Sequence, residues 1–348
     1  MGAIALSPTN IVNNQLTYDK DNTYISMSKY EESPEIMIKR GDVIFVKTGS
    51  TVGKVAYVDK MICKTTLNPQ VVVLKDIKCD NYILSVIMST RNFQNKIQRI
   101  TVGGAVPTLS QVAMGNIFIS LPAAKEQEKI SKFISLLDER IATQNKIIED
   151  LKKLKCAIIE KLYSKIQGKE YSFGQLFEVV NERNKQMKYS NILSASQEKG
   201  MVNRDDLNLD IQFERSNINT YKIVRAGDYV IHLRSFQGGF AFSDKLGVCS
   251  PAYTILRPKE VLEYGYLSYF FMSRQFIKSL ILVTYGIRDG RSINVEEWLG
   301  MKTKLPSKEE QRKILNVLCC FDEKIQNEEN MLNKLSKQKQ YLLRQMFI

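Results

Sequence analysis

The chain has 348 residues, 44% apolar and 25% charged, and this globular composition excludes disordered, collagen-like and low-complexity proteins. Its 50 lysines and arginines against 37 acidic residues give a net charge of +13, which favours a polyanionic partner, with nucleic acid first. The length predicts two domains, each long enough to bury its own core.

Some residue types limit the chemistry further. The single histidine, His232, excludes histidine-rich metal sites and disfavours a Ser-His-Asp triad. The six cysteines form no C-x-x-C pair, so we expect reduced thiols and a cytoplasmic protein. No window has the roughly 18 uninterrupted apolar residues of a membrane span, so no membrane partner is expected. The N-terminal segment also lacks the pattern of a signal peptide.

Residues 1–122 alternate short strand-like runs with turns. The strand candidates begin at Val43, Lys54 and Gln70 and are rich in valine, isoleucine and tyrosine. Gly41-Asp42 is expected to form a turn before the first of them. Residues 82–98 are predicted to form short helices with apolar and aromatic residues on the buried face, and Ser110 to cap another helix.

A long helix is expected next, because apolar residues recur with 4-3-4-3 spacing from Ile130 to Leu162, interrupted by Gln144 and Lys155. A sustained 3.5-residue period is typical of a coiled-coil seam. A helix of about 40 residues would be roughly 60 Å long, and such a seam is unstable unless it pairs with another helix.

Residues 167–306 repeat the mixed pattern. Strand candidates begin at Tyr229 and Ala252, Gly227-Asp228 is expected to form the equivalent turn, and Asn294 to cap a helix with Glu297 completing a capping box. This half opens with YSFGQLFEVVNERN, from Tyr171, which has no counterpart before Gly41-Asp42. The first domain is therefore expected to lack a first strand and helix.

The chain is an internal duplication. Residues 121–164 align without a gap with residues 305–348, and the second stretch repeats the apolar seam. We therefore expect the two long helices to pair antiparallel, in a register that places Lys155 opposite Glu328 and Gln144 opposite Lys339. The alternative is that the lysines extend into solvent.

No catalytic motif stands out. The segment from Lys47 to Val55 is one residue too short for a phosphate-binding loop and lacks the hydroxyl that binds magnesium. Asn68-Pro69-Gln70-Val71 lacks the second proline and the aromatic residue of an amino-methyltransferase signature. Paired carboxylates such as Asp138-Glu139 lie on the long helices, where a solvated face or a partner contact is favoured over acid–base work.

Polar turns are better candidates for a binding site. In both halves a turn between strand candidates carries donors that can enter a DNA groove, and further turns precede helix caps whose N–H groups favour phosphates. Ordinary exposed turn chemistry is the alternative for any single residue, but the paired placement favours binding. The candidate DNA-binding residues are Lys47, Thr48, Ser50, Thr51, Lys54, Thr108, Arg234, Ser235, Gln237, Arg288 and Arg291.

The element LP-x-x-x-EQ-x-K-I occurs at Leu121 and again at Leu305, each time followed by an Asp-Glu-x-Ile helix and a Lys-x-x-x-Ile/Leu-Ile/Leu end. This element resembles the repeated helical region of type I restriction–modification specificity subunits. The segment from Thr23 to Val58 is similar to the first target recognition domain of that family. The likeness covers essentially the whole chain.

This resemblance implies an α+β fold with two target recognition domains of bent β-sheet and short helices, separated by two long helices that form an antiparallel coiled coil. The expected parts are recognition domain 1 (1–122, N-terminally short), spacer helix 1 (123–166), recognition domain 2 (167–306) and spacer helix 2 (307–348).

The resemblance also implies a non-catalytic subunit that reads a split sequence on double-stranded DNA. Two methyltransferase subunits would dock on the helices, and restriction–translocase subunits would join them. S-adenosylmethionine, for adenine methylation, and ATP with Mg²⁺ would belong to those partners, and this chain would bind no cofactor. The candidate partner-binding residues are Glu126, Gln127, Asp138, Glu310, Gln311 and Asp322.

Two other functions remain open from the residues. A coiled-coil adaptor that never touches DNA would explain the helices, but it would not explain the basic charge or the duplicated turns. An enzyme with an unrecognised site, such as a nuclease, is disfavoured by the missing motifs. Steep salt dependence of DNA binding, together with a sequence preference, would separate recognition from the adaptor role.

Overall fold

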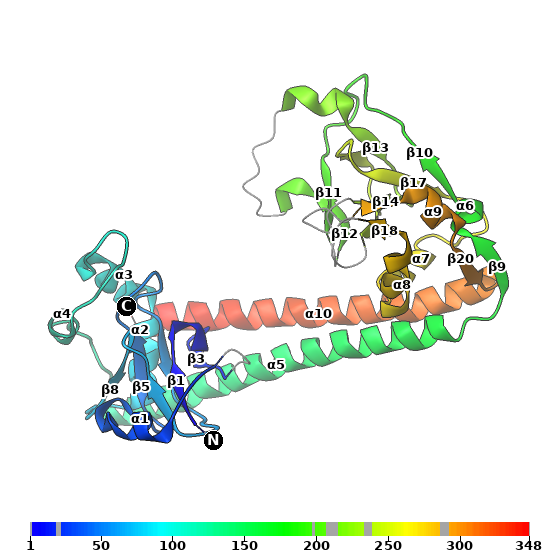
Figure 1. Cartoon of the computed structure of the whole chain (residues 1–348). Helices are drawn as coiled ribbons and strands as arrows, with labels where there is room; N and C mark the ends of the chain where they lie inside the picture. Colours follow the sequence, from blue (N-terminus) through cyan, green and yellow to red (C-terminus); the bar gives the residue numbers. More distant parts are fainter. Residues whose placement is uncertain are drawn as a thin grey trace. The chain divides into compact units, whose positions relative to one another are not determined.

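The computed structural model describes residues 2–18, 22–196, 199–206, 215–232, 239–285 and 292–347. The chain forms two compact units: unit 1 comprises Met1–Asn145 and Asn330–Ile348, and unit 2 comprises Lys146–Glu329. The boundaries fall inside the two long helices, α5 (Ala124–Ser164) and α10 (Lys308–Met346). Each unit therefore holds one domain with one half of each helix (Figure 1).

Unit 1 carries a domain of short strands. They are β1 (Ala3–Leu6), β2 (Ile11–Val12), β3 (Gln15–Leu16), β4 (Thr23–Ile25), β5 (Val43–Val46), β6 (Val55–Tyr57), β7 (Thr65–Leu67) and β8 (Val71–Leu74). They form a sheet in the order β2-β3-β6-β5-β8 and a smaller sheet in the order β4-β1-β7. The inner strand β5 is entirely apolar and buried, and it pairs antiparallel with β6 and β8. The strands predicted at Val43, Lys54 and Gln70 are thus confirmed.

The short helices of unit 1 begin at polar caps. They are α1 (Met27–Glu31), α2 (Asn81–Ser89), α3 (Arg91–Ile100) and α4 (Gln111–Gly115). Thr90 separates α2 from α3, because its backbone is extended and its hydroxyl accepts a hydrogen bond from Phe93 N. Ser110 caps α4 by accepting from Ala113 N at 3.1 Å, as predicted.

Unit 2 repeats this plan. Its strands are β9 (Lys169–Ser172), β10 (Phe177–Val180), β11 (Leu193–Ser196), β12 (Gly200–Asn203), β13 (Lys222–Val224), β14 (Tyr229–Ile231), β15 (Phe240–Phe242), β16 (Gly247–Cys249), β17 (Thr254–Pro258), β18 (Thr284–Tyr285), β19 (Ser292–Ile293) and β20 (Lys302–Leu305). Its short helices are α6 (Phe173–Leu176), α7 (Tyr266–Phe270), α8 (Arg274–Ser279) and α9 (Val295–Gly300). The main sheet has the order β10-β17-β14-β15, and β20 pairs with β9.

The core of unit 2 is aromatic. Phe173 stacks on Trp298 with ring centroids 4.4 Å apart and planes 9° apart, and both side chains are buried. Phe177, from β10, packs edge-on against Tyr229 of β14 at 5.3 Å. The segment that opens this half, α6 and β10, is therefore a structural part of the domain.

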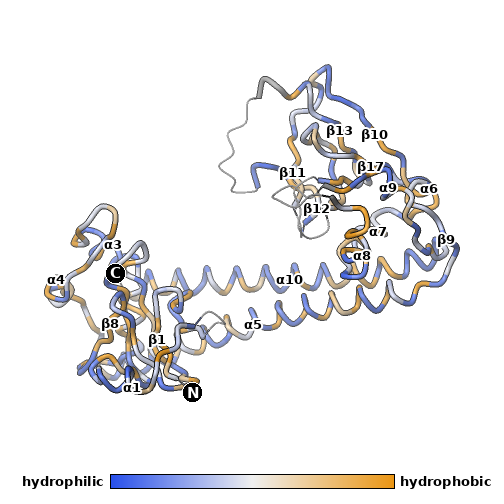
Figure 2. The backbone as a smooth tube through the Cα atoms, in the orientation of Figure 1, coloured by the Kyte–Doolittle hydropathy of each residue, from blue (hydrophilic) through white to orange (hydrophobic). Residues whose placement is uncertain are grey.

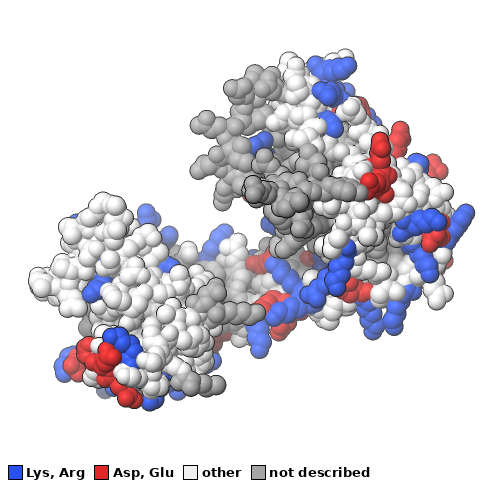
Figure 3. All heavy atoms as spheres, viewed as in Figure 1, with Lys and Arg blue, Asp and Glu red and all other residues white. Residues whose placement is uncertain are grey.

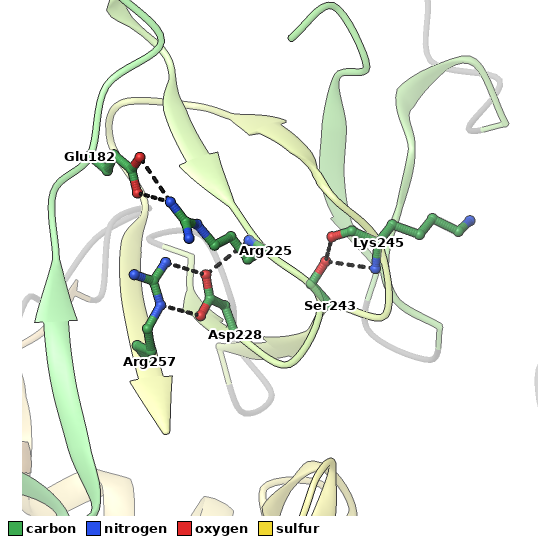
Figure 4. A network of polar contacts seen from close by, with 6 residues as sticks. All are labelled: Glu182, Arg225, Asp228, Ser243, Lys245 and Arg257. Atoms are coloured by element: carbon green, nitrogen blue, oxygen red, sulfur yellow. Dashed lines mark hydrogen bonds and ion pairs between the residues drawn. The ribbon is translucent and has the colours of Figure 1, made fainter. Parts of the chain in front are cut away.

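The Gly-Asp turn of unit 2 is fixed by ion pairs (Figure 4). Gly227 has φ +96°, a conformation that favours glycine, and precedes β14. The buried Asp228 accepts a hydrogen bond from Arg225 N and receives two from the Arg257 guanidinium at 3.0 and 3.1 Å. The hydrogen bonds to Asp228 raise the pKa of Arg257. Burial lowers that pKa, but its effect is smaller.

Unit 1 repeats this turn with a lysine in place of the arginine. Gly41 has φ +93°, and the buried Asp42 accepts from Lys39 N at 2.9 Å and pairs with the Lys75 ammonium at 3.1 Å. Both Gly-Asp pairs therefore form turns as predicted, and each aspartate ties its turn to the chain at β8 or β17. A buried carboxylate needs such partners, since an unpaired one is strongly destabilising.

Most buried side chains of α5 and α10 follow the predicted seam, but near the end of α5 the buried residues are Ile159 and Tyr163, one position after the predicted Ile158 and Leu162. Ile134, Gln144 and Ile148 of α5, and Leu318 and Ile325 of α10, are buried at the expected 3.5-residue spacing. Figure 2 shows hydrophobic residues recurring along both helices among hydrophilic ones. Within each unit the two half-helices run antiparallel (Figure 1). None of the helices in the described part of the chain is long and apolar enough to span a membrane.

The partners of the seam lysines differ from the prediction. In unit 2, Lys155 forms an ion pair with Asp322 of α10, not with Glu328. Glu328 pairs with Lys324, one turn away on its own helix. An i,i+4 pair forms within one helix, so it does not depend on how the two helices are aligned. The predicted register took no account of this local pair.

The equivalent lysine of unit 1 behaves in the same way. Lys339, predicted to face Gln144, forms its ion pair with Asp138 of α5. Lys155 and Lys339 occupy equivalent positions of the duplication, as do Asp322 and Asp138, so the two ion pairs are equivalent too. In each unit the two helix segments are therefore aligned by the same kind of lysine–aspartate contact.

Candidate functional site

Two loops of unit 1, residues 68–70 and 101–108, converge on the hairpin loop between β5 and β6. Gly49 N donates to Pro107 O at 2.9 Å, Lys47 N to Gln70 O at 2.9 Å, and Leu109 N to Lys47 O. We call residues 47–54, 68–70 and 101–108 the loop cluster. Main-chain hydrogen bonds hold it together, so its side chains are presented from a fixed backbone.

Two glycines and α3 shape the hairpin. Gly49 and Gly53 have φ of +106° and +98°. A Cβ on Gly53 would lie 2.4 Å from Gln94 Oε1, and the Gln94 amide donates to Gly53 O at 2.8 Å and to Met88 O at 2.7 Å. Helix α3 therefore packs directly against the hairpin and sets its position.

The structure brings together the candidate DNA-binding residues of unit 1. Thr48 and Thr108 are bridge partners on neighbouring loops, and Ser50 is exposed at the turn. Lys47 and Thr51 are half-buried beside them. These residues share one surface, although they come from segments about 60 residues apart in sequence.

Lys54 makes a contact within the domain that was not predicted, and its DNA binding stays a prediction. Its ammonium donates to Ile11 O at 3.2 Å and is half-buried. This contact ties the hairpin to the β2 strand, so the structure gives Lys54 a positioning contact within the domain.

Helix α3 is a candidate that the sequence reasoning missed. It contains no acidic residue, and its exposed residues are basic or carry amides. These residues are Arg91, Asn92, Asn95, Lys96, Gln98 and Arg99. Arginine, asparagine and glutamine are the side chains that pair with base edges and phosphates. The signal in the sequence is the segment RNFQNKIQR, whose polar residues are all basic or carry amides.

The charge of unit 1 is unevenly distributed. In Figure 3 the acidic side chains of this unit gather beside α1, where Glu31, Glu32 and Glu35 are exposed. The part of the same face that carries α3 shows basic but no acidic side chains. A polyanion would therefore be repelled at α1 and attracted at α3.

The corresponding candidates of unit 2 lie outside the described residues. They are Arg234, Ser235, Gln237, Arg288 and Arg291. Paired backbone flanks both segments: His232 N donates to Gly239 O at 2.9 Å, and Tyr285 pairs with Ser292. Asn294 caps α9 as predicted, by accepting from Glu296 N and Glu297 N. The predicted capping box differs: the side-chain amide of Asn294 donates to Glu297 Oε1, while its backbone N donates to Val283 O.

His232 lies at the end of β14, next to the first of those segments. Its side chain is half-buried, with its ring centroid 6.1 Å from that of Tyr253. Burial lowers the pKa of His232, because desolvation disfavours the imidazolium.

The candidate partner-binding glutamines turn out to be internal. Gln127 Oε1 accepts from Asp80 N at 2.9 Å, and its amide donates to Pro122 O. The side chain is buried, so it offers a partner no surface. Gln127 instead joins the start of α5 to the start of α2, which corrects the predicted role.

Gln311 makes the same contacts in unit 2. Its Oε1 accepts from Glu263 N at 2.8 Å, its amide donates to Pro306 O at 3.0 Å, and it too is buried. The Glu-Gln pair of the repeated element is thereby explained. Its glutamine fastens the helix to the domain, and its glutamate, Glu126 or Glu310, remains exposed.

Asp138 and Asp322 are likewise engaged within the chain. Tyr82 donates to Asp138 Oδ2 at 2.7 Å, and Tyr269 donates to Asp322 Oδ2 at 2.6 Å. Burial, and after it the carboxylate, raises the pKa of each tyrosine well above its usual value. Each aspartate therefore joins a short helix of its domain to a seam lysine. Partner binding through these two aspartates stays a prediction.

No group of three or more possible metal-ligating side chains occurs in the ranges that the structure describes. Each of the two domains is fastened to its helices by a buried glutamine and by a tyrosine–aspartate–lysine chain. In unit 1 the domain presents a fixed, basic, amide-rich surface.

Comparisons with known proteins agree with this geometry. The family described as "Type I restriction modification DNA specificity domain" matches residues 6–153 and 167–337. The type I restriction enzyme MjaVIII specificity subunit of Methanocaldococcus jannaschii is 26% identical over 346 residues, which cover 89% of this chain and 79% of that protein.

Two solved structures share the fold. A chain from a study of complex assembly and conformational transition in a type I restriction–modification system aligns with a TM-score of 0.61 at 14% identity, over 99% of this chain and 90% of that one. The S subunit of a type I restriction–modification system from M. genitalium aligns with a TM-score of 0.55 at 14% identity, over 100% of this chain and 93% of that one.

Proposed function

This chain belongs to the type I restriction-modification DNA specificity family, and we propose that each of its two domains reads one half of a bipartite DNA target. The chain is the DNA-specificity subunit of a type I restriction–modification complex and is not itself the catalyst. The observation that carries the proposal is the duplication: equivalent hairpins, β5–β6 and β14–β15, stand at the same place in both domains. Two equivalent recognition domains match a DNA target that has two parts.

In unit 1 the reading surface combines the loop cluster with α3. The loops supply hydroxyl and backbone donors for base edges, and α3 supplies Arg91 and Arg99 for phosphates. Gln94 fixes the helix on the hairpin, so base contacts and phosphate contacts are presented in one arrangement. Pre-organised contacts of this kind lose little entropy on binding.

The helices are the proposed docking sites for two methyltransferase subunits. Off the seam, α5 exposes Phe133 in unit 1, and α10 exposes Val317 in unit 2. The two residues are equivalent in the duplication. Two equivalent apolar positions, each on the same half-helix as an exposed glutamate, Glu126 or Glu310, fit two copies of one partner.

The cofactors belong to the partners in this proposal. S-adenosylmethionine for adenine methylation would be bound by the methyltransferase subunits, and ATP with Mg²⁺ by the restriction–translocase subunits. The target adenine would be extruded from the stack by the methyltransferase. This chain would supply only the recognition of the DNA sequence and the arrangement of the subunits around it.

Native mass spectrometry of the chain with a methyltransferase subunit tests the stoichiometry. We expect two methyltransferase subunits on the wild type, one on Phe133→Asp or Val317→Asp, and none on the double variant. Leu154→Asp is the matched control, since Leu154 is exposed on α5 but its equivalent position holds Gln338. A single bound subunit on the wild type, or equal loss with the control, would reject the two-site arrangement.

A gel-shift series across salt tests DNA recognition itself. The proposal expects a sequence preference and a steep loss of affinity with salt, because lysine and arginine release counterions from phosphates. An adaptor without DNA contact would show neither.

A further inference from the structure

The turn that precedes β8 in the loop cluster, residues 68–70, has a counterpart in unit 2. Val72 of β8 and Thr254 of β17 lie opposite the third residues of the equivalent strands β5 and β14. Residues 68–70 therefore correspond to residues 250–252, and both sequences have proline in the middle. The two units carry the same turn before the same strand.

The two turns are held by the same hydrogen bonds. In unit 1, Gln70 N donates to Asn68 Oδ1 at 3.0 Å, and in unit 2, Ala252 N donates to Ser250 Oγ at 3.3 Å. The residue after each turn donates its backbone N–H to the carbonyl of the first turn residue, at 3.1 Å in both units. The turn thus needs a side-chain acceptor at its first position, which asparagine and serine both supply.

The third position of the turn is where the two units differ. Gln70 of unit 1 and Ala252 of unit 2 are both exposed. Because the same turn forms around an alanine, the fold does not require the amide of Gln70. An exposed polar side chain that the fold does not require is available for binding.

The amide of Gln70 is nevertheless held in place. Its Oε1 accepts from Asn68 Nδ2 at 3.3 Å, and its backbone O accepts from Lys47 N at 2.9 Å. Its Nε2 lies 3.3 Å from the position that a Cβ on Gly49 would occupy, so this glycine leaves room for the amide beside the hairpin loop. Within the described part of the chain the two N–H groups of Nε2 have no hydrogen-bond partner, and Oε1 keeps a second lone pair.

A fixed amide with one donor and one acceptor to offer matches the major-groove edge of adenine. The adenine N6 amino group donates to such an Oε1, and adenine N7 accepts from such an Nε2. Guanine presents two acceptors at this edge, and cytosine and thymine present one hydrogen-bonding group each. Adenine is therefore the base that satisfies both atoms of the amide.

We infer that Gln70 determines the specificity of unit 1 at one adenine of the target, and that Asn68 is the residue that positions its amide. This role rests on the proposed function, since it names one base that the loop cluster reads. It also accounts for one difference between the sequences read by the two domains, because the side chain of Ala252 has no hydrogen-bonding group.

Selection of randomised double-stranded DNA by the chain assembled with its methyltransferase subunits tests this role. The bound duplexes are sequenced, and the enrichment of each base is measured at every position. We expect the wild type to enrich a two-part sequence with an adenine in one half. Gln70→Ala should lower the enrichment of that adenine at least about fivefold and leave the other half unchanged, because a bidentate contact is lost. Its Tm should equal that of the wild type, since unit 2 has alanine at this position.

Two further variants separate base reading from a structural role. Gln70→Glu keeps the acceptor and removes the donor, so it should replace the preferred adenine by cytosine, whose N4 amino group donates to a carboxylate. Asn68→Ser introduces the residue of unit 2, which keeps the turn but lacks Nδ2. It should lower the adenine enrichment less than Gln70→Ala does, without changing the Tm.

Gln15→Ala is the matched control, because Gln15 is an exposed amide of β3 outside the loop cluster. Base enrichment in Gln70→Ala equal to that of this control would overturn the inference. An equal loss of affinity for all sequences would overturn it too, because Gln70 would then contact a phosphate. In both cases the proposed function would stand, whereas a wild type that enriches no sequence would overturn the proposed function as well.

Discussion

The two domains share their polar contacts but not their cores. Unit 2 packs an aromatic cluster around Phe173 and Trp298 beside a smaller aliphatic one around Val224 and Val230, whereas both clusters of unit 1 are made largely of valine, isoleucine and leucine. The buried glutamine, the Gly-Asp turn and the tyrosine–aspartate–lysine chain occur in both. Apolar packing tolerates volume-conserving change, but a buried polar group needs its partner at one distance and angle. Duplicated polar contacts therefore keep the geometry while the cores diverge.

The comparison also explains why the units differ at the sheet edge. In unit 2 the aromatic cluster is closed by α6 and β10, which cover β17. In unit 1 the equivalent side chains are methionines and a phenylalanine that line an open groove. The following predictions test this difference, from the largest expected effect to the smallest.

Trp298→Ala should destabilise unit 2 by about 3–5 kcal/mol, because a fully buried aromatic side chain is removed from a closed core. Met114→Ala, at the equivalent position of unit 1, should have less than half that effect, because the side chain is half-buried beside a groove. Differential scanning calorimetry of the two variants measures the contrast. Equal losses would show that the groove of unit 1 is filled in solution.

Gln311→Ala should destabilise unit 2 by about 2 kcal/mol, since Glu263 N and Pro306 O would lose their buried partner. Gln127→Ala should act likewise on unit 1, through Asp80 N and Pro122 O. Urea unfolding measures both changes, with the exposed Glu310→Gln as control. A loss no larger than that of the control would refute the fastening role of the glutamines.

The stability of unit 2 should depend on His232 at mildly acidic pH. The pKa of His232 in the folded chain is below its ordinary value of 6.5, so the unfolded chain binds the proton more readily. Stability from this group is present above pH 6.5 and is lost as the pH falls through the folded pKa. His232 is the only histidine, so its NMR titration reads the pKa directly. A titration midpoint at or above 6.5 would contradict the prediction, and His232→Asn should remove the dependence.

Periodic and local signals of the sequence predicted much of this fold. The Gly-Asp turns, the caps at Ser110 and Asn294 and most of the 3.5-residue seam of α5 and α10 are confirmed, because each depends on neighbours within a few residues. The register of the helices was only partly predictable. Lys155 pairs with Asp322 of α10, whereas Glu328, the predicted partner, pairs with Lys324 of its own helix.

The candidate site was harder to predict, since it depends on contacts between distant segments. The sequence indicated the loop from Lys47 and the cap loop at Thr108, and the structure joins them. It could not show that Gln127 and Gln311 are buried, because their partners lie about 50 residues away. The apolar spacing in α3 predicts only which of its faces is buried. It does not show that the opposite, exposed face belongs to the candidate site.

The central claim is that each domain reads one half of a split DNA target. Its most direct test replaces Thr48, Ser50 and Thr51 with alanine and maps the methylated sites of host DNA made by the complete complex. The account predicts that one half of the recognised sequence changes or relaxes while the other half and the spacing between them stay the same. An unchanged target, or a change in both halves, would contradict it.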